Sequence, residues 1–228
     1  MNDKFLLKKS GGAFLLEKTY ETIFPNKCLF CRRVLDDARA VLCGECVKSA
    51  KFGAGVMPEH VCRVYVAYEY EQEARHAIFR FKYEGKRLLA KPMARLIFDC
   101  FGKMGYDFLV PVPLHAARIK ERGFNQAALL AMELSGLMDL PAYDGMVRIK
   151  DTKQQFQLDF EERADNMVNA FGIKESFDVR NKNVLLVDDI LTTGATVAEC
   201  AKVLKEVGAK SVSLVVFAGV VHAPIALN

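Results

Sequence analysis

The chain has 228 residues, of which 51% are hydrophobic, and a formal net charge of +4. This is enough sequence for one ordinary domain and a smaller module, and the charge permits a polyanionic partner without requiring one. No apolar run is long enough to predict a membrane span or a signal peptide. Seven cysteines, four of them in a metal-like spacing, favour a reducing cytoplasm over a disulfide scaffold.

The first 55 residues divide into two predicted units. Residues 1–24 contain a short amphipathic stretch that ends before Pro25, and we expect a packing helix there. Residues 25–55 hold two CxxC pairs, which are separated by eleven residues. Paired CxxC units bring four thiolates around zinc and fill its tetrahedral coordination sphere, so we predict a structural zinc module. The alternative is four buried free cysteines. The cysteines are Cys28, Cys31, Cys43 and Cys46.

Basic and aromatic side chains accompany these cysteines. The basic ones are expected to form a solvated face, and a patch that contacts nucleic-acid phosphates is the alternative. Phe30 and Phe52 are expected to pack inside the module, with base stacking as the alternative. The basic residues are Lys27, Arg32, Arg33, Arg39, Lys48 and Lys51.

A larger domain is predicted over residues 56–228, because Gly53–Gly55 and Pro58 are typical of a linker. Early in this domain, residues 80–87 are basic and include two aromatic side chains. A solvated corner and a nucleic-acid contact explain this stretch equally well. The hydrophobic periodicity predicts strands over 61–68, 107–112, 146–149, 184–187 and 211–217, and helices over 71–82, 87–103, 126–138 and 197–207.

Residues 184–196 combine a buried strand, two adjacent acids, a hydroxyl-rich turn and the start of a helix. A turn that leads into a helix presents unpaired N–H groups and the positive end of the helix dipole, which suits an anion. Gly194 allows a close approach of the main chain, and nearby threonine hydroxyls can donate to the same anion. Asp188 and Asp189 suit a neighbouring diol or a divalent cation. Together these features describe a site for a ribose 5-phosphate.

Two other interpretations of this stretch agree less well with its residues. One is an ordinary strand–helix junction with an exposed acid pair. It would require the apolar run, the two acids, the Thr-Thr-Gly sequence and the start of the helix to occur together by chance. A nucleotide-binding P-loop matches less well, because the glycine spacing differs and no Lys-Ser/Thr follows Gly194.

The stretch resembles the signature of the type I phosphoribosyltransferases, which bind 5-phosphoribosyl 1-pyrophosphate (PRPP). The resemblance implies an α/β fold with a mostly parallel sheet flanked by helices, behind a small zinc-ribbon-like module. It also implies Mg²⁺ bound with PRPP, a pyrophosphate contact in the loop after the 107–112 strand, and a catalytic role for Asp188 and Asp189. The residues implied to bind PRPP are Asp188, Asp189, Ile190, Leu191, Thr192, Thr193, Gly194, Ala195, Thr196, Pro113, Leu114, Arg118, Arg122, Arg148 and Arg163.

Two loops around this stretch carry further expectations. The Val112–Pro113 bond can be cis, because prolyl bonds adopt that form at low cost. Residues 150–166 are polar, without apolar periodicity until late. They resemble the mobile loop that closes over PRPP and excludes water from the reacting sugar. A plain surface loop followed by a helix is the alternative.

Taken together, the motifs resemble the ComF family, which is associated with DNA uptake during natural transformation. The resemblance implies a cytoplasmic role in handling incoming single-stranded DNA. PRPP, single-stranded DNA and a competence helicase or other DNA-uptake proteins are the implied partners. The motifs are the four cysteines, Pro111–Leu114, Arg122–Gln126, Thr152 with Gln155, Leu158, Arg163 and Asn166, and Asp188–Thr196.

The resemblance leaves the reaction open. The chain begins Met1-Asn2, without the N-terminal cysteine nucleophile of glutamine PRPP amidotransferases. The short segment after Phe217 offers little for the nucleobase-binding hood of salvage enzymes, whose place the zinc module would take. Three functions follow as hypotheses: handling of single-stranded DNA by a protein that keeps a PRPP site, transfer of phosphoribosyl to an unidentified acceptor with Asp189 as a candidate base, and regulation of DNA affinity by PRPP.

Overall fold

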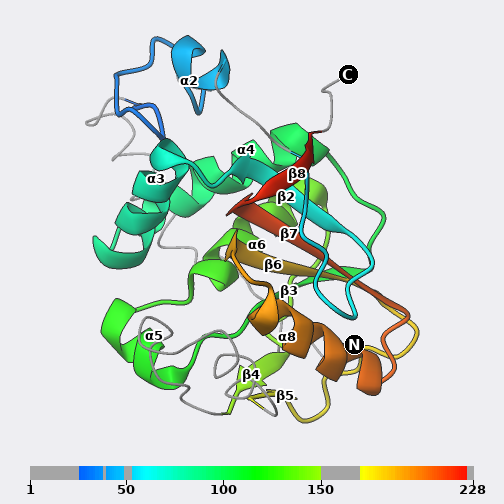
Figure 1. The fold of residues 1–228 in the computed structure, drawn as a ribbon. Helices are drawn as coiled ribbons and strands as arrows, with labels where there is room; N and C mark the ends of the chain where they lie inside the picture. Colours follow the sequence, from blue (N-terminus) through cyan, green and yellow to red (C-terminus); the bar gives the residue numbers. More distant parts are fainter. Residues whose placement is uncertain (1–25, 38–39, 49–52, 150–169, 225–228) are drawn as a thin grey trace.

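A computed structural model describes residues 26–37, 40–48, 53–149 and 170–224. The chain is built around a six-stranded sheet in the order β3-β6-β7-β2-β1-β8, in which β3, β6, β7 and β2 run parallel (Figure 1). β1 is antiparallel to both β2 and β8. The bounds are β1 Gly53–Gly55, β2 Val64–Glu69, β3 Phe108–Pro111, β6 Asn183–Leu191, β7 Ser211–Gly219 and β8 Val221–Pro224.

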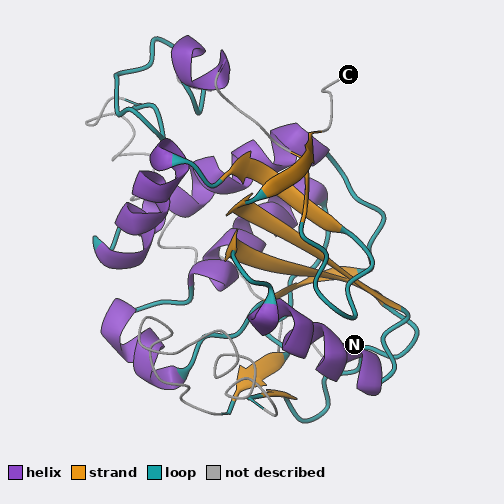
Figure 2. Cartoon of the chain, in the orientation of Figure 1, coloured by secondary structure: helices purple, strands orange, loops and turns teal. Residues whose placement is uncertain are grey.

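Helices cover both faces of this sheet, which confirms the predicted mostly parallel α/β fold (Figure 2). One hydrophobic cluster joins α3, α4 and α6 to the face that carries Leu185 and Val187. The other joins α8 and the β4–β5 hairpin to the face that carries Val184 and Leu186. The bounds are α3 Gln72–Tyr83, α4 Ala90–Phe101, α6 Gln126–Met138, α8 Ala195–Glu206, β4 Met146–Arg148 and β5 Phe171–Ile173.

The long elements agree with the predicted hydrophobic periodicity, because alternate residues of β6 are buried against opposite helix layers. Three short helices complete the part of the fold that the structure describes. The stretch predicted as one helix over 87–103 begins as a 3₁₀ turn before α4. A helix over 116–122 was not predicted, because its seven residues carry no apolar stripe. The short helices are α2 Gly44–Lys48, η2 Arg87–Leu89 and α5 Ala116–Arg122.

Several local expectations are corrected. Gly53–Gly55 is not a linker but the strand β1, and the segment after β7 adds the strand β8 beside it. The central strand does not end before the acid pair, because β6 continues through Leu191 and pairs with β7 up to Gly219. The Val112–Pro113 bond is trans, and no cis peptide bond occurs among the described residues. The expected helix in 1–24, the loop over 150–166 and Phe52 lie outside them.

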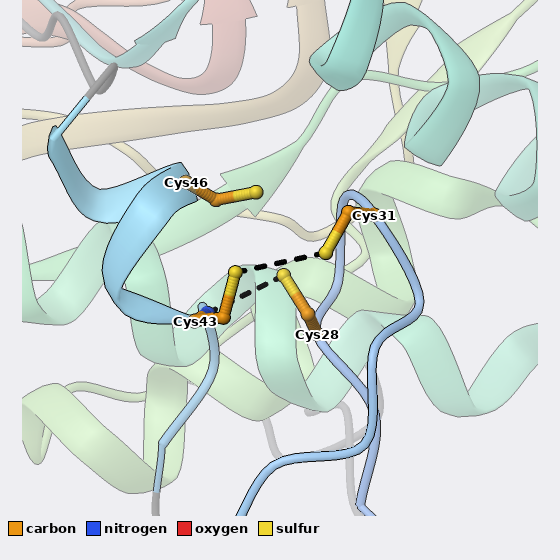
Figure 3. A group of neighbouring side chains, drawn as sticks. All are labelled: Cys28, Cys31, Cys43 and Cys46. Atoms are coloured by element: carbon orange, nitrogen blue, oxygen red, sulfur yellow. Dashed lines mark hydrogen bonds between the residues drawn. The ribbon is translucent and has the colours of Figure 1, made fainter.

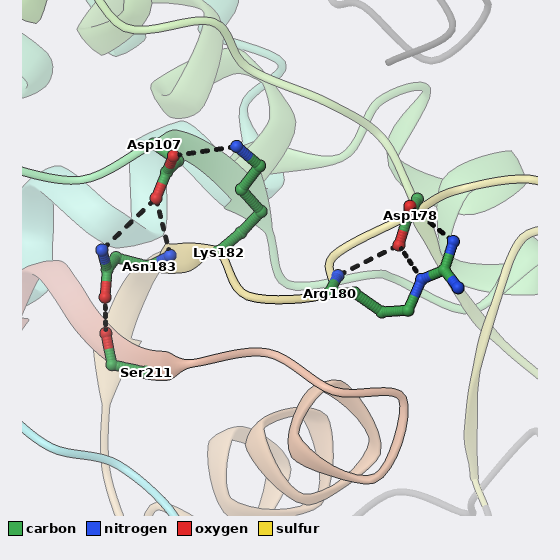
Figure 4. Close-up of polar contacts among 6 residues, drawn as sticks. All are labelled: Asp107, Asp178, Arg180, Lys182, Asn183 and Ser211. Carbon is green, nitrogen blue, oxygen red and sulfur yellow. Dashed lines mark hydrogen bonds and ion pairs between the residues drawn. The ribbon is translucent and has the colours of Figure 1, made fainter.

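A polar network joins the amino ends of β3, β6 and β7 (Figure 4). The Asp107 carboxylate accepts from the backbone N–H of Asn183 at 2.8 Å and lies 3.2 Å from Lys182 Nζ. Ser211 Oγ donates to Asn183 Oδ1 at 2.7 Å. These contacts fix the strand starts at one end of the sheet, so that the carboxyl ends of the same strands meet at the opposite edge. No described helix is long and apolar enough to cross a membrane.

Candidate functional site

The predicted anion-binding turn lies at the carboxyl end of β6, where α8 begins. Thr192 and Thr193 are exposed in the turn, and Gly194 is the N-cap of α8 with φ +80°. This glycine provides no side-chain cap, so the first-turn N–H groups of Ala195 and Thr196 face outward for another acceptor. A Cβ at position 194 would lie 2.9 Å from Pro58 Cγ. The turn is therefore held in place by the segment that precedes β2.

The acid pair occupies the last part of β6. Asp188 Oδ1 accepts from the backbone N–H of Asp189 at 2.8 Å. Burial, and after it the charge of Asp189, raise the pKa of Asp188 to about 7. Asp189 is only 3% exposed. Two neighbouring carboxylates repel each other, which contributes to the raised pKa of Asp188 and suits a divalent metal or a diol that donates to both.

The sequence analysis missed the cation that lies against this pair. Lys82, in the last turn of α3, places Nζ 2.9 Å from Asp189 Oδ2, and both side chains are mostly buried. Burial opposes the charge of Lys82, but Asp189 and then Asp188 outweigh it and raise the pKa of the ammonium. A signal was present in the sequence, because Lys82 continues the helical spacing of the buried residues Ala74 and Ile78.

The loop after β3 forms a second wall beside the acid pair. Pro113 is buried and Leu114 half-buried, directly after a strand that pairs with β6. Asn125, the N-cap of α6, accepts from the N–H of Ala127 at 3.0 Å and donates to the carbonyl of Val112 at 3.1 Å. One side chain thus starts α6 and fixes the exit of β3, which gives a structural reason for Asn125 within the Arg122–Gln126 motif.

The predicted arginines belong to different parts of the chain. Arg122 stacks 5.2 Å from the ring centroid of Tyr83 and donates to Gln126 Oε1 at 3.3 Å. Its charge also acts on Lys82, so Arg122 belongs to the same group as the acid pair. Arg118 is half-buried one turn earlier on α5. Arg163 lies outside the described residues.

Arg148 approaches the site from the other face of the sheet. It ends β4 and stacks 5.3 Å from the ring centroid of Phe171 in β5. Burial raises the pKa of the Cys200 thiol on α8, the Asp188 charge raises it further, and Arg148 opposes both. Asp188 and Arg148 therefore lie near the same point of α8, while Arg122 and Lys82 lie on the side of Asp189.

The four predicted cysteine ligands form a second site. Their sulfur atoms all lie within 4.8 Å of one another, and Cys31 Sγ is 3.6 Å from Cys43 Sγ (Figure 3). Tetrahedral Zn–S bonds of ~2.3 Å place sulfurs roughly 3.8 Å apart. The backbone N–H of Cys46 lowers the pKa of Cys43 to about 7, whereas burial and the neighbouring thiols raise the pKa of Cys46. The set fits a structural tetrathiolate metal such as zinc.

This cysteine module packs directly on the larger domain. Phe30 is 5% exposed and lies 4.4 Å from the Tyr68 ring centroid and 6.2 Å from that of Phe217. Tyr68 Oη donates to the carbonyl of Cys46 at 3.0 Å, and Arg80 of α3 donates to the carbonyl of Leu29. Phe30 is thus a packing residue, as expected, and its ring contacts lie on the sheet rather than within the module alone.

Comparison with known proteins identifies the family. The chain is 30% identical over 221 residues to Competence protein F of Haemophilus influenzae, covering 84% of this chain and 96% of that protein. It is 29% identical to Competence protein ComFC of Bacillus subtilis, covering 92% and 93%. The chain belongs to the ComF family of competence proteins. DNA utilization protein YhgH of Escherichia coli K12 is also similar, with 29% identity over 83% of this chain and 95% of its own.

A phosphoribosyl transferase domain is matched over residues 119–224 of this ComF-family chain. A solved glutamine PRPP amidotransferase from B. subtilis matches 58% of this chain and 26% of its own, with a TM-score of 0.39 and 19% identity. The matched residues contain the acid pair, the turn after β6 and most of α5. They leave out the cysteine module and α3, so Lys82 lies outside the matched residues.

Proposed function

We propose that this ComF-family protein binds PRPP together with Mg²⁺ and acts in DNA uptake, handling single-stranded DNA in the cytoplasm. The observation that carries the PRPP site is the bare N-terminus of α8 beside two adjacent carboxylates. The turn from Thr192 to Thr196 would bind the 5-phosphate, with Ile190 and Leu191 supporting it from the end of β6. Asp188 and Asp189 would bind the ribose hydroxyls or Mg²⁺.

The pyrophosphate of PRPP would lie between the β3 loop and α5 in this proposal. Pro113 and Leu114 shape the loop, and the guanidinium groups of Arg118 and Arg122 suit phosphate oxygens. Arg148 would approach from the α8 side, and Arg163 would come from the expected lid over 150–166. Mg²⁺, when bound, would neutralise the pyrophosphate and orient it relative to the sugar.

Calorimetry tests the PRPP site. PRPP should bind in the presence of Mg²⁺, and the doubly substituted protein Asp188→Asn, Asp189→Asn should not bind while keeping its circular dichroism spectrum. A useful control is Asp178→Asn, because Asp178 lies in the turn before β6 and pairs with Arg180 away from the site (Figure 4). Absence of binding heat for the unmodified protein, with no change in its melting temperature, would refute the proposal.

An exposed aromatic pair beside the site supports the proposed contact with DNA. Phe79 and Tyr83 lie one helical turn apart on α3, with ring centroids 5.1 Å apart and more than half of each residue exposed. Arg75 precedes Phe79 by one turn on the same face, and Arg87 follows the helix. Exposed aromatic rings among cations are the features that bind single strands without sequence preference.

Binding of a fluorescent oligothymidylate at several salt concentrations tests this surface. Affinity should fall steeply as salt rises, because phosphate contacts release counterions. Phe79→Ala with Tyr83→Ala should weaken binding about tenfold or more at every salt concentration, since stacking contributes ~1–3 kcal/mol per base. Val207→Ala, at another exposed apolar residue, should change nothing. Equal affinity of the aromatic and control variants would exclude this surface.

The alternative function is transfer of phosphoribosyl to an unidentified acceptor. The raised pKa of Asp188, about 7, favours it and makes Asp188 a better candidate base than Asp189, which is paired with Lys82, because a general base works best when it titrates near the working pH. Pyrophosphate release from PRPP should then appear with one member of a panel of nucleobases, amines and DNA. Release that Asp188→Asn does not abolish would remove Asp188 from that role, and no release with any acceptor would leave binding without turnover.

A further inference from the structure

A lysine from outside the matched domain lies inside the proposed PRPP site. Lys82 follows Ala74 and Ile78 at successive four-residue steps on α3, a face that otherwise carries buried apolar side chains. Its side chain is 18% exposed, that of Asp189 is 4% exposed, and the two charged atoms are 2.9 Å apart. A lysine at a core position of an amphipathic helix carries a large desolvation cost, and an apolar side chain would fold there as well or better.

Two buried N–H donors in this region have no hydrogen-bond acceptor among the described residues. Gln126 is 3% exposed, and its Nε2 has no hydrogen-bond partner among the described residues. The buried Nε of Arg122, whose Nη1 donates to the same Gln126 side chain, is also without a partner in that part of the chain. An unpaired amide N–H and an unpaired guanidinium N–H thus belong to the group that Arg122 forms with Gln126, and the charge of Arg122 acts on the Lys82 ammonium. Buried donors that remain unpaired cost free energy, which an anionic ligand would recover by accepting from them.

We propose that Lys82 is a pyrophosphate-binding residue that exchanges partners. In the free protein its ammonium neutralises Asp189; when Mg²⁺ and the ribose diol occupy the carboxylates, Lys82 turns to the pyrophosphate oxygens, beside Arg122 and Gln126. This inference rests on the proposed PRPP function and adds to it the residue that recognises the pyrophosphate end of the ligand. The exchange keeps every charge paired in both states, because the cation that leaves Asp189 is replaced by Mg²⁺.

The test separates the two ends of the ligand. Binding of PRPP, inorganic pyrophosphate and ribose 5-phosphate, each with Mg²⁺, is measured by calorimetry for the unmodified protein, Lys82→Met, Lys82→Arg and Lys86→Met. Lys82→Met should lose at least tenfold in affinity for PRPP and pyrophosphate but bind ribose 5-phosphate within about twofold of the unmodified protein. Lys82→Arg should retain pyrophosphate affinity. Lys86→Met, at an exposed lysine of the same segment, should match the unmodified protein.

The possible results have different meanings. If Lys82 only holds Asp189 in place, Lys82→Met loses ribose 5-phosphate and pyrophosphate affinity together, which overturns the inference. Unchanged affinity for pyrophosphate in that variant overturns it as well. Failure of the unmodified protein to bind PRPP refutes the proposed function itself. Should Lys82→Met not fold, Lys82→Arg decides, because it keeps a cation. Loss of pyrophosphate affinity in Lys82→Arg, with retained ribose 5-phosphate affinity, overturns the inference that the charge at this position changes partners.

Discussion

Asp188 stays protonated in the folded chain over a range of pH in which an exposed aspartate is ionised. Burial and the neighbouring Asp189 raise its pKa to about 7, against ~3.9 in an unfolded chain. Between these two values the folded state binds more protons than the unfolded state. The free energy of unfolding therefore falls as pH rises through this window and becomes level above it. The acid pair is a site where stability has been lost in favour of binding.

Replacement of Asp188 by asparagine should therefore stabilise the protein, and more so at higher pH. We expect Asp188→Asn to raise the melting temperature by roughly 2–4 °C or more at pH 8, which corresponds to about 1 kcal/mol, and to have little effect at pH 4.5. Asp178→Asn should instead lower the melting temperature slightly and equally at both pH values, because Arg180 lowers the pKa of that exposed carboxyl to about 2 and its contribution is lost only below pH ~4. Equal shifts at both pH values would show that Asp188 does not titrate as described.

Gly194 is required by both its conformation and its surroundings. Its φ of +80° disfavours a side chain by ~1–2 kcal/mol, and an added Cβ would meet Pro58 at 2.9 Å. Gly194→Ala should lower the free energy of unfolding by about 2 kcal/mol and abolish PRPP binding. Gly136→Ala in α6 is the matched control: nothing lies within 4 Å, so it should stabilise by ~0.5–1 kcal/mol. Thermal melts of both variants test this, and a neutral Gly194→Ala would contradict it.

The strand–turn–helix motif could be recognised from the sequence because the residues that carry its chemistry follow one another along the chain. Lys82 could not be placed in the site, since its partner Asp189 is more than one hundred positions away and only the fold joins α3 to β6. Its presence on the apolar stripe of α3 indicated burial but named no partner. The same limit applies to Pro58, which contacts Gly194 across the sheet edge.

At the scale of elements, the amino ends of β3, β6 and β7 depend on Asp107. The backbone N–H of Asn183, followed by other contacts that include Lys182, lowers the pKa of this carboxyl. A lowered pKa means that its stabilising contribution is complete above pH ~4 and is lost as pH falls through the depressed value. The network is therefore an acid-sensitive connection between strands that lies far from the carboxyl edge of the sheet.

Asp107→Asn should lower the free energy of unfolding by about 1 kcal/mol at pH 7, or roughly 2–4 °C in melting temperature. The difference from the unmodified protein should shrink as pH falls through the depressed pKa of Asp107, because the aspartate then becomes protonated. Asp99→Asn removes an exposed α4 ion pair with Arg95 and should cost less than 0.5 kcal/mol. A pH-independent loss in Asp107→Asn would indicate that its hydrogen bonds, and not its charge, stabilise the strand ends.

The helix α3 joins three parts of the molecule that looked separate in the sequence. Arg80 donates to the cysteine module at Leu29, Lys82 contacts Asp189, and Phe79 with Tyr83 forms the exposed aromatic pair. The periodicity of α3 predicted its existence and its buried face. The competing interpretations of residues 80–87 were both incomplete, because Arg80 contacts the cysteine module and Lys82 contacts Asp189, while residues 83–87 are exposed.

At the scale of the whole molecule, the cysteine module and the sheet share one hydrophobic cluster. Cys28, Cys43 and Cys46 belong to it together with Phe217 of β7 and Phe81 of α3. If the two predicted units were independent, loss of a cysteine ligand would loosen the module and spare the larger core. The shared cluster changes that expectation, because unfolding of the module would expose apolar surface on α3 and β7.

Removal of the metal should therefore destabilise the entire chain. We expect Cys28→Ser, or treatment with a strong chelator, to release about one equivalent of zinc and to lower the melting temperature on the order of 10 °C in a single transition. Cys62→Ser, at an exposed cysteine outside the cluster, should keep both zinc and stability. Metal analysis and calorimetry measure these quantities. Two separate transitions would instead support an independent module.

The fold class was predictable from the sequence because buried strands, amphipathic helices and turn residues agree along most of the chain. The predictions failed where few residues decide an element. β1 has three residues, two of them glycine, and forms only because β2 and β8 supply partners on either side. α5 depends on caps at His115 and Gly123 and on no apolar stripe. Long-range pairing, which a single sequence does not display, determines β1, whereas local capping determines α5.

The pairing of β4 with β5 should allow the segment between these two strands to be exchanged. Ile149 donates to the carbonyl of Ala170 at 2.7 Å, so the segment between them leaves and returns at one hydrogen bond. A span closed at its base tolerates changes in length, since each doubling costs only ~0.6 kcal/mol. Exchange of residues 152–167 for a short Gly-Ser connector should therefore preserve the fold, and the PRPP affinities of the exchanged and natural proteins would test the lid proposed over residues 150–166.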